Sequence, residues 1–599
     1  MTQMSAKAGI RKHGQAAINA LMKEFAQLHN QDTFDPVHAH KLTKAQKDAA
    51  LRAVNLIKEK RNGDIKGRTC ADGRKQRPLY TKGEMSSPTL SSESLLMLLC
   101  VDAIEERDTA FCDVAGAYLN ALMKELVHMK LTGEVVDILC DLDSSYREFV
   151  VLENGRKTLY VRLVKALYGC IQSALRWYEL FSSTLEKQGF TLNPYDMCVA
   201  NKNVDGKQLT VAWYVDDLKI SHKDSEVVTS TIRFLESKFG KMTVTRGKQH
   251  EYIGMHIRFN KDRTVTINMS HHVNEALATF PDTVSKATTT PAKKDLFEID
   301  ETSERLSPSD AEVFHSITAK LLFISQRARI DVLLPVAFLC TRVSHPTEQD
   351  WEKLRRVLQY LHGTKDMELI LGMDVTDGKF ATLTAWVDAS YGVHPDKKSH
   401  TGGTMSFGRG AFSCKSKKQK LNTKSSTEAE VVGASDYLPN MLWAKNFLEA
   451  QGIDIGNHLV FNQDNESAIR LEMNGRSSAG PQSKHIDNRY FWITDRIKQK
   501  EIRIKHCPTE HMLADFFTKP LQGSLFAHFR SILLGHQPVA AISNPTSSAS
   551  VPPGLNKERV GGAVLSPKGT EGKPSSLSTN ITCSHSTKKN VHDEGNPQP

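Results

Sequence analysis

Two adjacent aspartates between apolar runs constrain this chain most. Residues 210–222 read TVAWYVDDLKISH. Before Asp216 and Asp217, one set of residues (Val211, Trp213 and Val215) alternates with a second (Thr210, Ala212 and Tyr214). An alternation with a period of two predicts two short strands, with the aspartates at the tip of the hairpin between them. Aspartate is common in turns because its side chain bonds nearby backbone amides, so a turn alone explains an isolated pair.

Asp113 adds a third acid to this pair. Residues 108–123 read DTAFCDVAGAYLNALM, which predicts a strand that ends at Asp113 and then a helix. An acid at a strand end, beside a hairpin tip that carries two more, predicts a cluster of three carboxylates. Carboxylates that share a site repel one another strongly unless cations lie between them. Divalent cations with oxygen ligands meet this need, and a pair of them is used for phosphoryl transfer.

A second pattern begins near residue 380. It predicts three strands, a long helix, a strand that runs into a helix, another helix, a strand and a last helix. In chain order these are residues 383–392, 401–408, 411–419, 425–452, 459–475, 484–500, 501–507 and 508–521. Four acids lie on these elements: Asp388, Glu430, Asp464 and Asp515. Taken singly, Asp464 is explained as a helix N-cap and Asp515 as a solvated helix acid.

Two glutamates of the long helix have different predicted roles. Ser425 and Glu428 have the S-x-x-E spacing of a capping box at the start of a helix. Glu430 shares a helix face with Ala434 and Leu438, which turns toward the sheet. A buried acid on that face is costly unless it binds something. We therefore assign Glu430 to a metal site and Glu428 to the cap.

These motifs resemble a known family. YVDD between apolar strands, preceded by DVAGAYLN and LVKALYGCIQSALRWYELF, resembles the reverse transcriptase palm of copia-type LTR retrotransposons. Further along, WVDAS, STEAE, DNESAI, KHID and LADFFTKPL resemble the ribonuclease H of the same elements. The region between them, 311–364, reads as helical and resembles the family's connection between its two catalytic modules.

The resemblance implies roles for individual residues of the first site. It gives metal binding to three acids: Asp113, Asp216 and Asp217. Gln172 matches a glutamine near the incoming nucleotide and the template, and Lys66 and Arg68 resemble basic residues near the triphosphate. Tyr118 matches a bulky aromatic residue packed against the sugar, although a core position would also explain it. Ala174 stands where many relatives have proline, a departure that concerns the connection between fingers and palm.

The second site follows the same logic. The resemblance implies a two-metal ribonuclease H centre formed by four acids: Asp388, Glu430, Asp464 and Asp515. His485 matches a family position, and either an accessory role or packing explains it; His511 is a weaker candidate. The implied cofactor is Mg²⁺, two ions per site, with Mn²⁺ as an alternative. The implied partners are an RNA template, a DNA or tRNA primer, an RNA–DNA hybrid and deoxynucleoside triphosphates.

The expected fold is α/β (α+β), a right-hand polymerase with fingers, palm and thumb, followed by a helical connection and a ribonuclease H-like domain. The expected segments are a helical N-terminal extension (1–60), fingers and palm (61–258), thumb and connection (259–375), the ribonuclease H-like domain (376–537) and a disordered tail (538–599). The tail is rich in Ser, Thr, Pro, Gly and Asn, and it cannot bury enough apolar area to offset the entropy of ordering.

Composition narrows the class further. A formal net charge of +10 over 599 residues fits a polyanionic partner, although each basic cluster alone is explained as a solvated face. Ten cysteines without a C-x-x-C pair argue against a disulfide framework or a zinc ribbon. The longest apolar run, LLMLLCVDAI, is too short to span a bilayer. We expect an intracellular protein, cytoplasmic in a virus-like particle and with access to the nucleus.

Three alternatives are open. A glycoside hydrolase or an aspartic protease needs two acids, which leaves the ordered sets of three and four unexplained. An integrase-like nuclease orders its acids D, D, E, whereas Glu430 precedes Asp464 here. The last alternative is a decayed or repurposed retroelement fragment that binds nucleic acid without catalysis.

Overall fold

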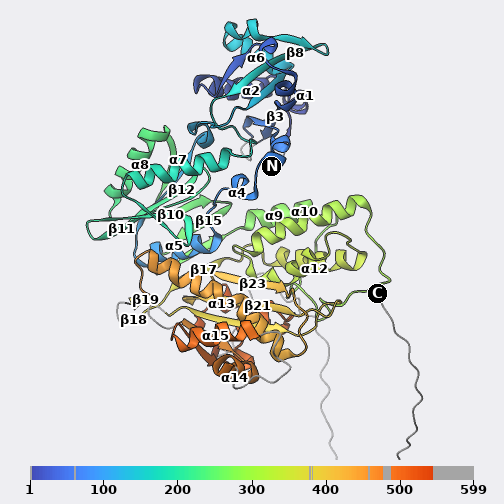
Figure 1. The fold of residues 1–599 in the computed structure, drawn as a ribbon. Helices are drawn as coiled ribbons and strands as arrows, with labels where there is room; N and C mark the ends of the chain where they lie inside the picture. The colour runs from blue at the N-terminus through green and yellow to red at the C-terminus, as the bar shows by residue number, and fades with distance from the viewer. Residues whose placement is uncertain are drawn as a thin grey trace, which may run out of the picture. The chain divides into compact units, whose positions relative to one another are not determined.

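The fold is a mixed α/β structure built on several sheets. A computed structural model describes residues 3–59, 63–376, 379–380, 382–455, 459–475 and 487–543 (Figure 1). These residues lie within Met1–Ser547, the larger of two compact units into which the chain divides. The described sheets have seven, six, five, two and five strands. His485 and the tail from residue 544 lie outside the described residues.

The first sheet has the strand order β1-β3-β6-β8-β2, with β4 paired to β3 and β7 to β8. Its strands are β1 (Gln3–Ser5), β2 (Phe34–Val37), β3 (Leu51–Glu59), β4 (Ile65–Ala71), β6 (His128–Thr132), β7 (Val151–Glu153) and β8 (Arg156–Leu163). Its helices are α1 (Ala6–His13), α2 (Gln15–Asn30), α3 (Lys44–Ala49) and α6 (Glu134–Leu142), with 3-10 turns at η1 (Ala39–Lys41), η2 (Gly73–Leu79) and η4 (Ser144–Phe149).

The prediction of a helical N-terminal extension over 1–60 holds for α1, α2 and α3 but not for β1, β2 and β3. β3 pairs with β4 in antiparallel register from Ala53 opposite Ala71 to Glu59 opposite Ile65. The predicted boundary at residue 60 therefore cuts a hairpin whose second strand carries the predicted nucleotide-binding residues Lys66 and Arg68. Helices α1 and α2 are amphipathic, whereas β3 is held by pairing with β1 before it and with β4 and β6 after it in the chain.

The second sheet has the order β13-β5-β12-β11-β10-β9. Its strands are β5 (Asp108–Val114), β9 (Thr191–Asn193), β10 (Asp196–Val204), β11 (Lys207–Tyr214), β12 (Asp217–His222) and β13 (Met242–Arg246). The helices of this region are α4 (Lys82–Met85), α5 (Ser92–Ile104), α7 (Ser173–Lys187) and α8 (Ser225–Phe239). Every side chain from Ser94 to Ala103 in α5 is buried, which explains the continuous apolar run found in the sequence.

The helix predicted after Asp113 is also wrong. β5 runs on to Val114, and the chain then forms only the short 3-10 helix η3 (Ala117–Asn120). Gly116, which precedes it, lies in the left-handed region with φ 66° and starts this tight turn. The turn places Tyr118 close behind the strand that ends beside Asp113.

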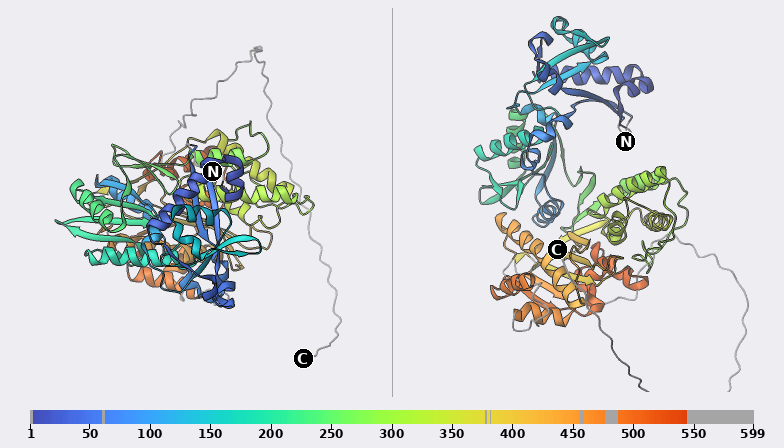
Figure 2. Two further views of the ribbon diagram at one scale, coloured as in Figure 1. Left: turned by 90° about the horizontal axis from the view of Figure 1, so that it is seen from above. Right: turned by 45° about the vertical axis from the view of Figure 1, so that its right-hand side comes forward.

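The third sheet, β14-β15-β16-β17-β22, joins parts of the chain that are far apart in sequence. Its strands are β14 (Gln249–Tyr252), β15 (Met255–Phe259), β16 (Val265–Asn268), β17 (Leu369–Met373) and β22 (Gly408–Arg409), and β18 (Val375–Thr376) pairs with β19 (Lys379–Phe380). The helices are α9 (Ser270–Thr279), α10 (Pro308–Ser325), η5 (Ile330–Val332), α11 (Leu333–Cys340) and α12 (Glu348–Gly363). Helices α9, α10 and α12 pack together (Figures 1 and 2). The prediction that 311–364 is helical is confirmed.

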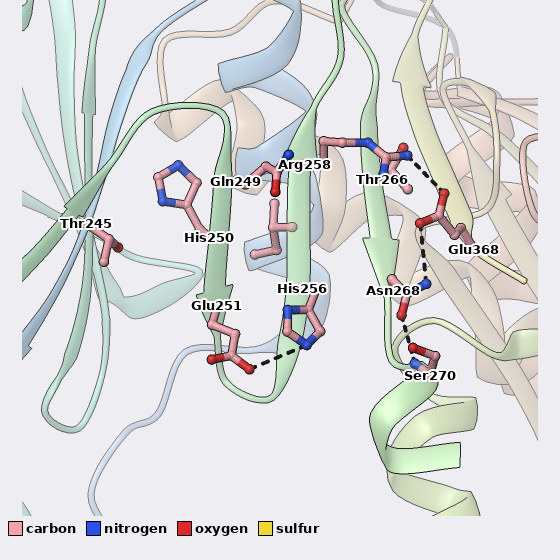
Figure 3. A pocket seen from close by; sticks show the side chains of 11 residues that line it. Thr245, Gln249, His250, Glu251, His256, Arg258, Thr266, Asn268, Ser270 and Glu368 are labelled. Carbon is pink, nitrogen blue, oxygen red and sulfur yellow. Dashed lines mark hydrogen bonds and ion pairs between the residues drawn. The ribbon is translucent and has the colours of Figure 1, made fainter. Parts of the chain in front are cut away.

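A groove of about 550 Å³ lies on the outer side of this sheet (Figure 3). Arg258 on β15 forms an ion pair with Glu368 at 3.0 Å across its floor, and the Glu368 carboxylate also accepts a hydrogen bond from Asn268 at 3.3 Å. None of the predicted site residues lines this groove. The candidate chemistry therefore lies elsewhere, at the carboxylates.

The last sheet has the order β23-β21-β20-β24-β25, with β20, β24 and β25 parallel. Its strands are β20 (Thr384–Ser390), β21 (His400–Ser406), β23 (Ser413–Lys418), β24 (Leu459–Gln463) and β25 (Ile502–His506). The helices are α13 (Ser426–Ala450), α14 (Glu466–Asn474), α15 (Asp487–Lys498) and α16 (Gly523–Leu533), with 3-10 turns η8 (Thr509–His511), η9 (Leu513–Phe517) and η10 (Val539–Ser543). Helix α13 packs on β20 and β21 (Figure 1).

Two predictions fail near the end of the described chain. The helix predicted over 508–521 is two short 3-10 turns, separated at Met512 by an extended backbone with ψ 90°. Residues 539–543, predicted to belong to a disordered tail, form η10, and Pro538 pairs with Arg409 in a β-bridge. The structure contains no helix among the described residues that is long and apolar enough to cross a membrane.

Candidate active sites

The first acidic centre forms where β5 meets the β11–β12 hairpin. Asp217, the first residue of β12, lies directly opposite Asp113 of β5 in the antiparallel register. Tyr214 pairs with Asp217, so Val215 and Asp216 form a two-residue turn between them. The Val114 amide donates to the Asp216 carbonyl at 3.0 Å, which fixes the turn against β5. The structure thus brings Asp113 together with two adjacent acids that lie about a hundred residues later in the chain.

The turn is strained and is held from two sides. Val215 has φ 60°, a left-handed conformation that is rare for a β-branched residue. The indole Nε1 of Trp177 donates to the Val215 carbonyl at 2.7 Å, and the Tyr252 hydroxyl donates to the Asp217 carbonyl at 3.1 Å. Strain of this kind persists only where surrounding contacts over-determine the backbone, which is typical of functional sites.

The electrostatics of this centre favour bound cations. Burial, followed by the charges of Asp216 and Asp113, raises the pKa of Asp217 to about 6. Partial burial and the Asp216 charge raise the pKa of Asp113, while Lys66 acts in the opposite direction. Carboxylates with raised pKa values in a shared site gain most from a positive charge placed between them.

The predicted nucleotide-binding residues have different surroundings. Burial and the Asp216 charge raise the pKa of Tyr118, and its ring lies 4.5 Å from that of Tyr168, centroid to centroid. The Arg68 guanidinium carbon lies 4.2 Å from the Tyr168 ring centroid. Gln172 is buried, and its side-chain oxygen accepts a hydrogen bond from Arg176 at 3.3 Å.

The second acidic centre collects side chains from four elements. One ligand oxygen from each of Asp388, Asp464 and Asp515 lies within 4.8 Å of the other two. Asp388 comes from β20, Asp464 follows β24 and Asp515 lies in η9. Asp388 and Asp515 are 2% and 4% exposed, so neither is the solvated acid that would be expected of a surface helix.

Glu430 belongs to the second centre. It is 5% exposed, and its Oε2 has no hydrogen-bond partner among the described residues. Burial, then the charges of Asp388 and Asp464, raise its pKa well above the usual value. An orphaned buried carboxylate oxygen beside three other acids fits a cation ligand.

The helix-capping roles at the starts of α13 and α14 belong to residues next to the acids of the second centre. The Glu428 carboxylate accepts from the Lys424 amide at 2.7 Å, and the Glu428 amide donates to the Ser425 hydroxyl at 3.2 Å. Glu428 therefore stabilises the start of α13. The cap of α14 is Asn465, whose side-chain oxygen accepts from the Ala468 amide at 3.0 Å. Asp464 is thereby left for the acidic centre.

Lys519 is a residue of this centre that sequence analysis missed. Its ammonium lies 2.7 Å from Asp515 and 3.4 Å from Asp388, and the Thr518 hydroxyl donates to Asp388. Burial, then the Asp388 charge, raise the pKa of Asp515 to about 7 although Lys519 opposes this. The spacing of four residues from Asp515 in LADFFTKPL was the available signal.

The region that carries the first centre matches a known protein family. Residues 32–294 match the family described as "Reverse transcriptase (RNA-dependent DNA polymerase)". These residues contain Asp113, Asp216 and Asp217. Residues 32–294 are therefore similar to a reverse transcriptase domain. The match begins inside the predicted N-terminal extension and ends beyond residue 258.

Whole-chain relatives of the reverse transcriptase are transposon polyproteins. The chain is 26% identical over 525 residues to "Retrovirus-related Pol polyprotein from transposon TNT 1-94" of Nicotiana tabacum, covering 85% of this chain and 37% of the relative. It is 23% identical over 534 residues to "Transposon Ty1-DR1 Gag-Pol polyprotein" of Saccharomyces cerevisiae, covering 85% and 28%. The resemblance to copia-type retrotransposon polyproteins is confirmed. The chain spans about a third of the length of these relatives.

Among solved structures, the chain aligns with a foamy viral protease-reverse transcriptase in complex with RNA/DNA hybrid. The alignment covers 83% of this chain and 54% of the viral chain, with 11% sequence identity and a TM-score of 0.46. A TM-score this low supports no argument about the chain.

Both centres of this chain fit divalent cations. In the first, the cross-strand pair of Asp113 and Asp217 with Asp216 at the turn supplies oxygen ligands only, the type that Mg²⁺ and Mn²⁺ prefer. In the second, the three clustered aspartates and the orphaned Glu430 oxygen supply the same type.

Proposed function

We propose that this chain is an RNA-directed DNA polymerase that also cleaves the RNA strand of an RNA–DNA hybrid. The observation that carries the polymerase assignment is the register of the palm sheet. It sets Asp217 opposite Asp113 and holds Asp216 in a strained turn beside them, all within the reverse transcriptase domain. A protein that retained only nucleic-acid binding would gain nothing from this strain or from this repulsion.

The polymerase reaction joins a deoxynucleotide to a primer. The primer 3′-hydroxyl attacks the α-phosphorus of a deoxynucleoside triphosphate, the bond from that phosphorus to the β-phosphate oxygen breaks, and pyrophosphate leaves. Two Mg²⁺ ions held by the acids Asp113, Asp216 and Asp217 would lower the pKa of the hydroxyl and neutralise the leaving charge. Lys66 and Arg68 on β4 would supply positive charge for the triphosphate, and the Tyr118 ring would exclude a 2′-hydroxyl from the sugar.

The second centre supports hydrolysis of an RNA phosphodiester. Water attacks the phosphorus, the bond to the ribose 3′-oxygen breaks, and a 5′-phosphate and a 3′-hydroxyl result. Four acids from β20, α13, the end of β24 and η9 would hold the divalent cations: Asp388, Glu430, Asp464 and Asp515. Three further side chains donate to this cluster: the Thr518 hydroxyl and the Lys519 ammonium to Asp388, Lys519 also to Asp515, and the Thr509 hydroxyl to Asp464.

One experiment separates enzyme from binder. The purified full chain is given a DNA primer annealed to an RNA template with deoxynucleotides, in Mg²⁺, in Mn²⁺ and in a chelator. Extension of the primer and shortening of the RNA, both abolished by the chelator, are expected. Retention of the template without either reaction would support the decayed or repurposed fragment instead.

A further inference from the structure

The turn that follows β8 is docked onto the end of β4. The Ala71 amide donates to the Tyr168 carbonyl at 2.7 Å. Gly169 has φ +91°, and a Cβ placed there would lie 2.0 Å from the Ala71 carbonyl oxygen. Only glycine permits this approach, so the backbone itself fixes Tyr168 relative to the strand that carries Lys66 and Arg68.

The side chain of Tyr168 contacts three residues of the first centre. The Arg68 guanidinium lies over its ring at 4.2 Å, and the Tyr118 ring packs against it at 4.5 Å between centroids. Its hydroxyl donates to the Asp216 carboxylate at a long 3.5 Å. One half-buried tyrosine thus joins the basic strand, the residue assigned to the sugar and the strained catalytic turn.

We propose that Tyr168 is a positioning residue for the incoming deoxynucleotide. Its ring holds the Arg68 guanidinium by a cation–π contact and limits the freedom of the Tyr118 ring behind it. An arginine that is already ordered loses less freedom when it binds a triphosphate, and a supported ring resists displacement by a 2′-hydroxyl. The proposal deepens the polymerase function stated above and rests on it. The hydroxyl has the smaller part, because its bond to Asp216 is at the upper limit of hydrogen-bond length.

The test compares two substitutions that separate ring from hydroxyl. Tyr168→Phe keeps the ring, so KM for deoxynucleotides and the preference for deoxy- over ribonucleotides should stay near the wild-type values. Tyr168→Leu removes the ring, so KM should rise about threefold to tenfold and the sugar preference should fall by a similar factor, with kcat changed less. Tyr146→Phe, on a tyrosine that bonds His29 at 2.9 Å in the first sheet, is the matched control.

A double-mutant cycle shows whether Tyr168 acts through Arg68. In an Arg68→Ala background, Tyr168→Leu should raise KM no further, because the contact it breaks is already absent. Equal effects of Tyr168→Leu in both backgrounds, or unchanged KM and sugar preference in a folded Tyr168→Leu chain, would overturn the proposal. If Tyr168→Leu does not fold, Tyr168→Met fills a similar volume without a ring and replaces it.

Binding of dTTP to the chain on a dideoxy-terminated primer and RNA template gives affinity without turnover. Weaker dTTP binding by Tyr168→Leu than by the wild type supports the positioning role, even if the wild-type chain does not extend a primer. Failure of the wild-type chain to extend a primer would reject only the polymerase activity. A wild-type chain that binds no dTTP overturns both.

Discussion

The two acidic centres offset the repulsion among their carboxylates in different ways. In the first centre, Asp113 is exposed and forms no ion pair with the described residues, and the Lys66 charge only opposes the rise in its pKa. In the C-terminal sheet, Asp388 and Asp515 are buried and Lys519 pairs directly with both. A centre that must admit a triphosphate and a primer end needs open space and positive charge at a distance. A centre that cleaves a backbone phosphate can be closed and can carry a cation of its own.

The two centres also differ in what an incoming cation meets. We expect cations and nucleotide to enter the first centre while its acids are only partly desolvated. In the second centre we expect an incoming cation to compete with the Lys519 ammonium for the same oxygens. The following predictions test this difference, from the largest expected effect to the smallest.

Asp216→Asn should abolish primer extension and leave hybrid cleavage nearly intact, and Glu430→Gln should do the reverse. Each loss should be about a thousandfold or more, because a missing metal ligand removes several kcal/mol of transition-state stabilisation. Both rates are measured on one labelled hybrid. Glu428→Gln is the control on α13 and should lower stability by no more than ~0.5–2 kcal/mol while cleavage persists. Loss of both activities in a folded Asp216→Asn chain would contradict two independent centres.

Tyr118→Ala should raise ribonucleotide incorporation relative to deoxynucleotide incorporation by about tenfold to a hundredfold, since the ring excludes the 2′-hydroxyl sterically. Tyr118→Phe should keep the preference because the ring remains. Single-nucleotide insertion with matched ribo- and deoxynucleotides is the measurement. An unchanged preference in an active Tyr118→Ala chain would return Tyr118 to a packing role beside Tyr168.

Lys519→Met should destabilise the chain in a chelator by about 1–2 kcal/mol. A broken buried pair costs more, but the Lys519 side chain is 39% exposed and solvent screens part of its charge. Mg²⁺ should then raise the melting temperature more in the variant than in the wild type, because the cation replaces the lost ammonium. Lys417→Met, on an exposed lysine of β23, is the control. Equal Mg²⁺ responses in variant and wild type would show that Lys519 does not occupy a cation position.

The last prediction concerns pH. The pKa of Asp217 is raised to about 6 and that of Asp515 to about 7, so the folded chain holds more protons than the unfolded chain between about pH 4 and these values. Without divalent ions, stability should therefore fall as pH rises through this window. Mg²⁺ binds the deprotonated acids, so its gain in melting temperature should be about 2–4 °C larger at pH 8 than at pH 5.5. A gain that is independent of pH would argue against cation binding at these acids.

Local pattern was sufficient for several features of this protein. The alternation around Trp213 predicted the hairpin and placed Asp216 and Asp217 at its tip, because strand periodicity and turn chemistry are local properties. The face shared by Glu430, Ala434 and Leu438 separated the buried glutamate from its capping neighbour Glu428 for the same reason. These features depend on residues within one or two turns of each other.

Tertiary structure decided the rest. The partner of Asp217 is Asp113 only because β5 and β12 are adjacent in the sheet, and strand order cannot be read from periodicity. The N-terminal segment was assigned to helix throughout because β4 and β6, which pair with β3 beside β1, come later in the chain. Lys519 was overlooked because its ion pair with Asp388 joins residues that lie 131 apart in the chain. Tyr168 was overlooked because its ring contact with the Arg68 guanidinium joins residues that lie about a hundred apart. The sequence determined which residues are acidic and where strands turn, while long-range packing decided which charges meet.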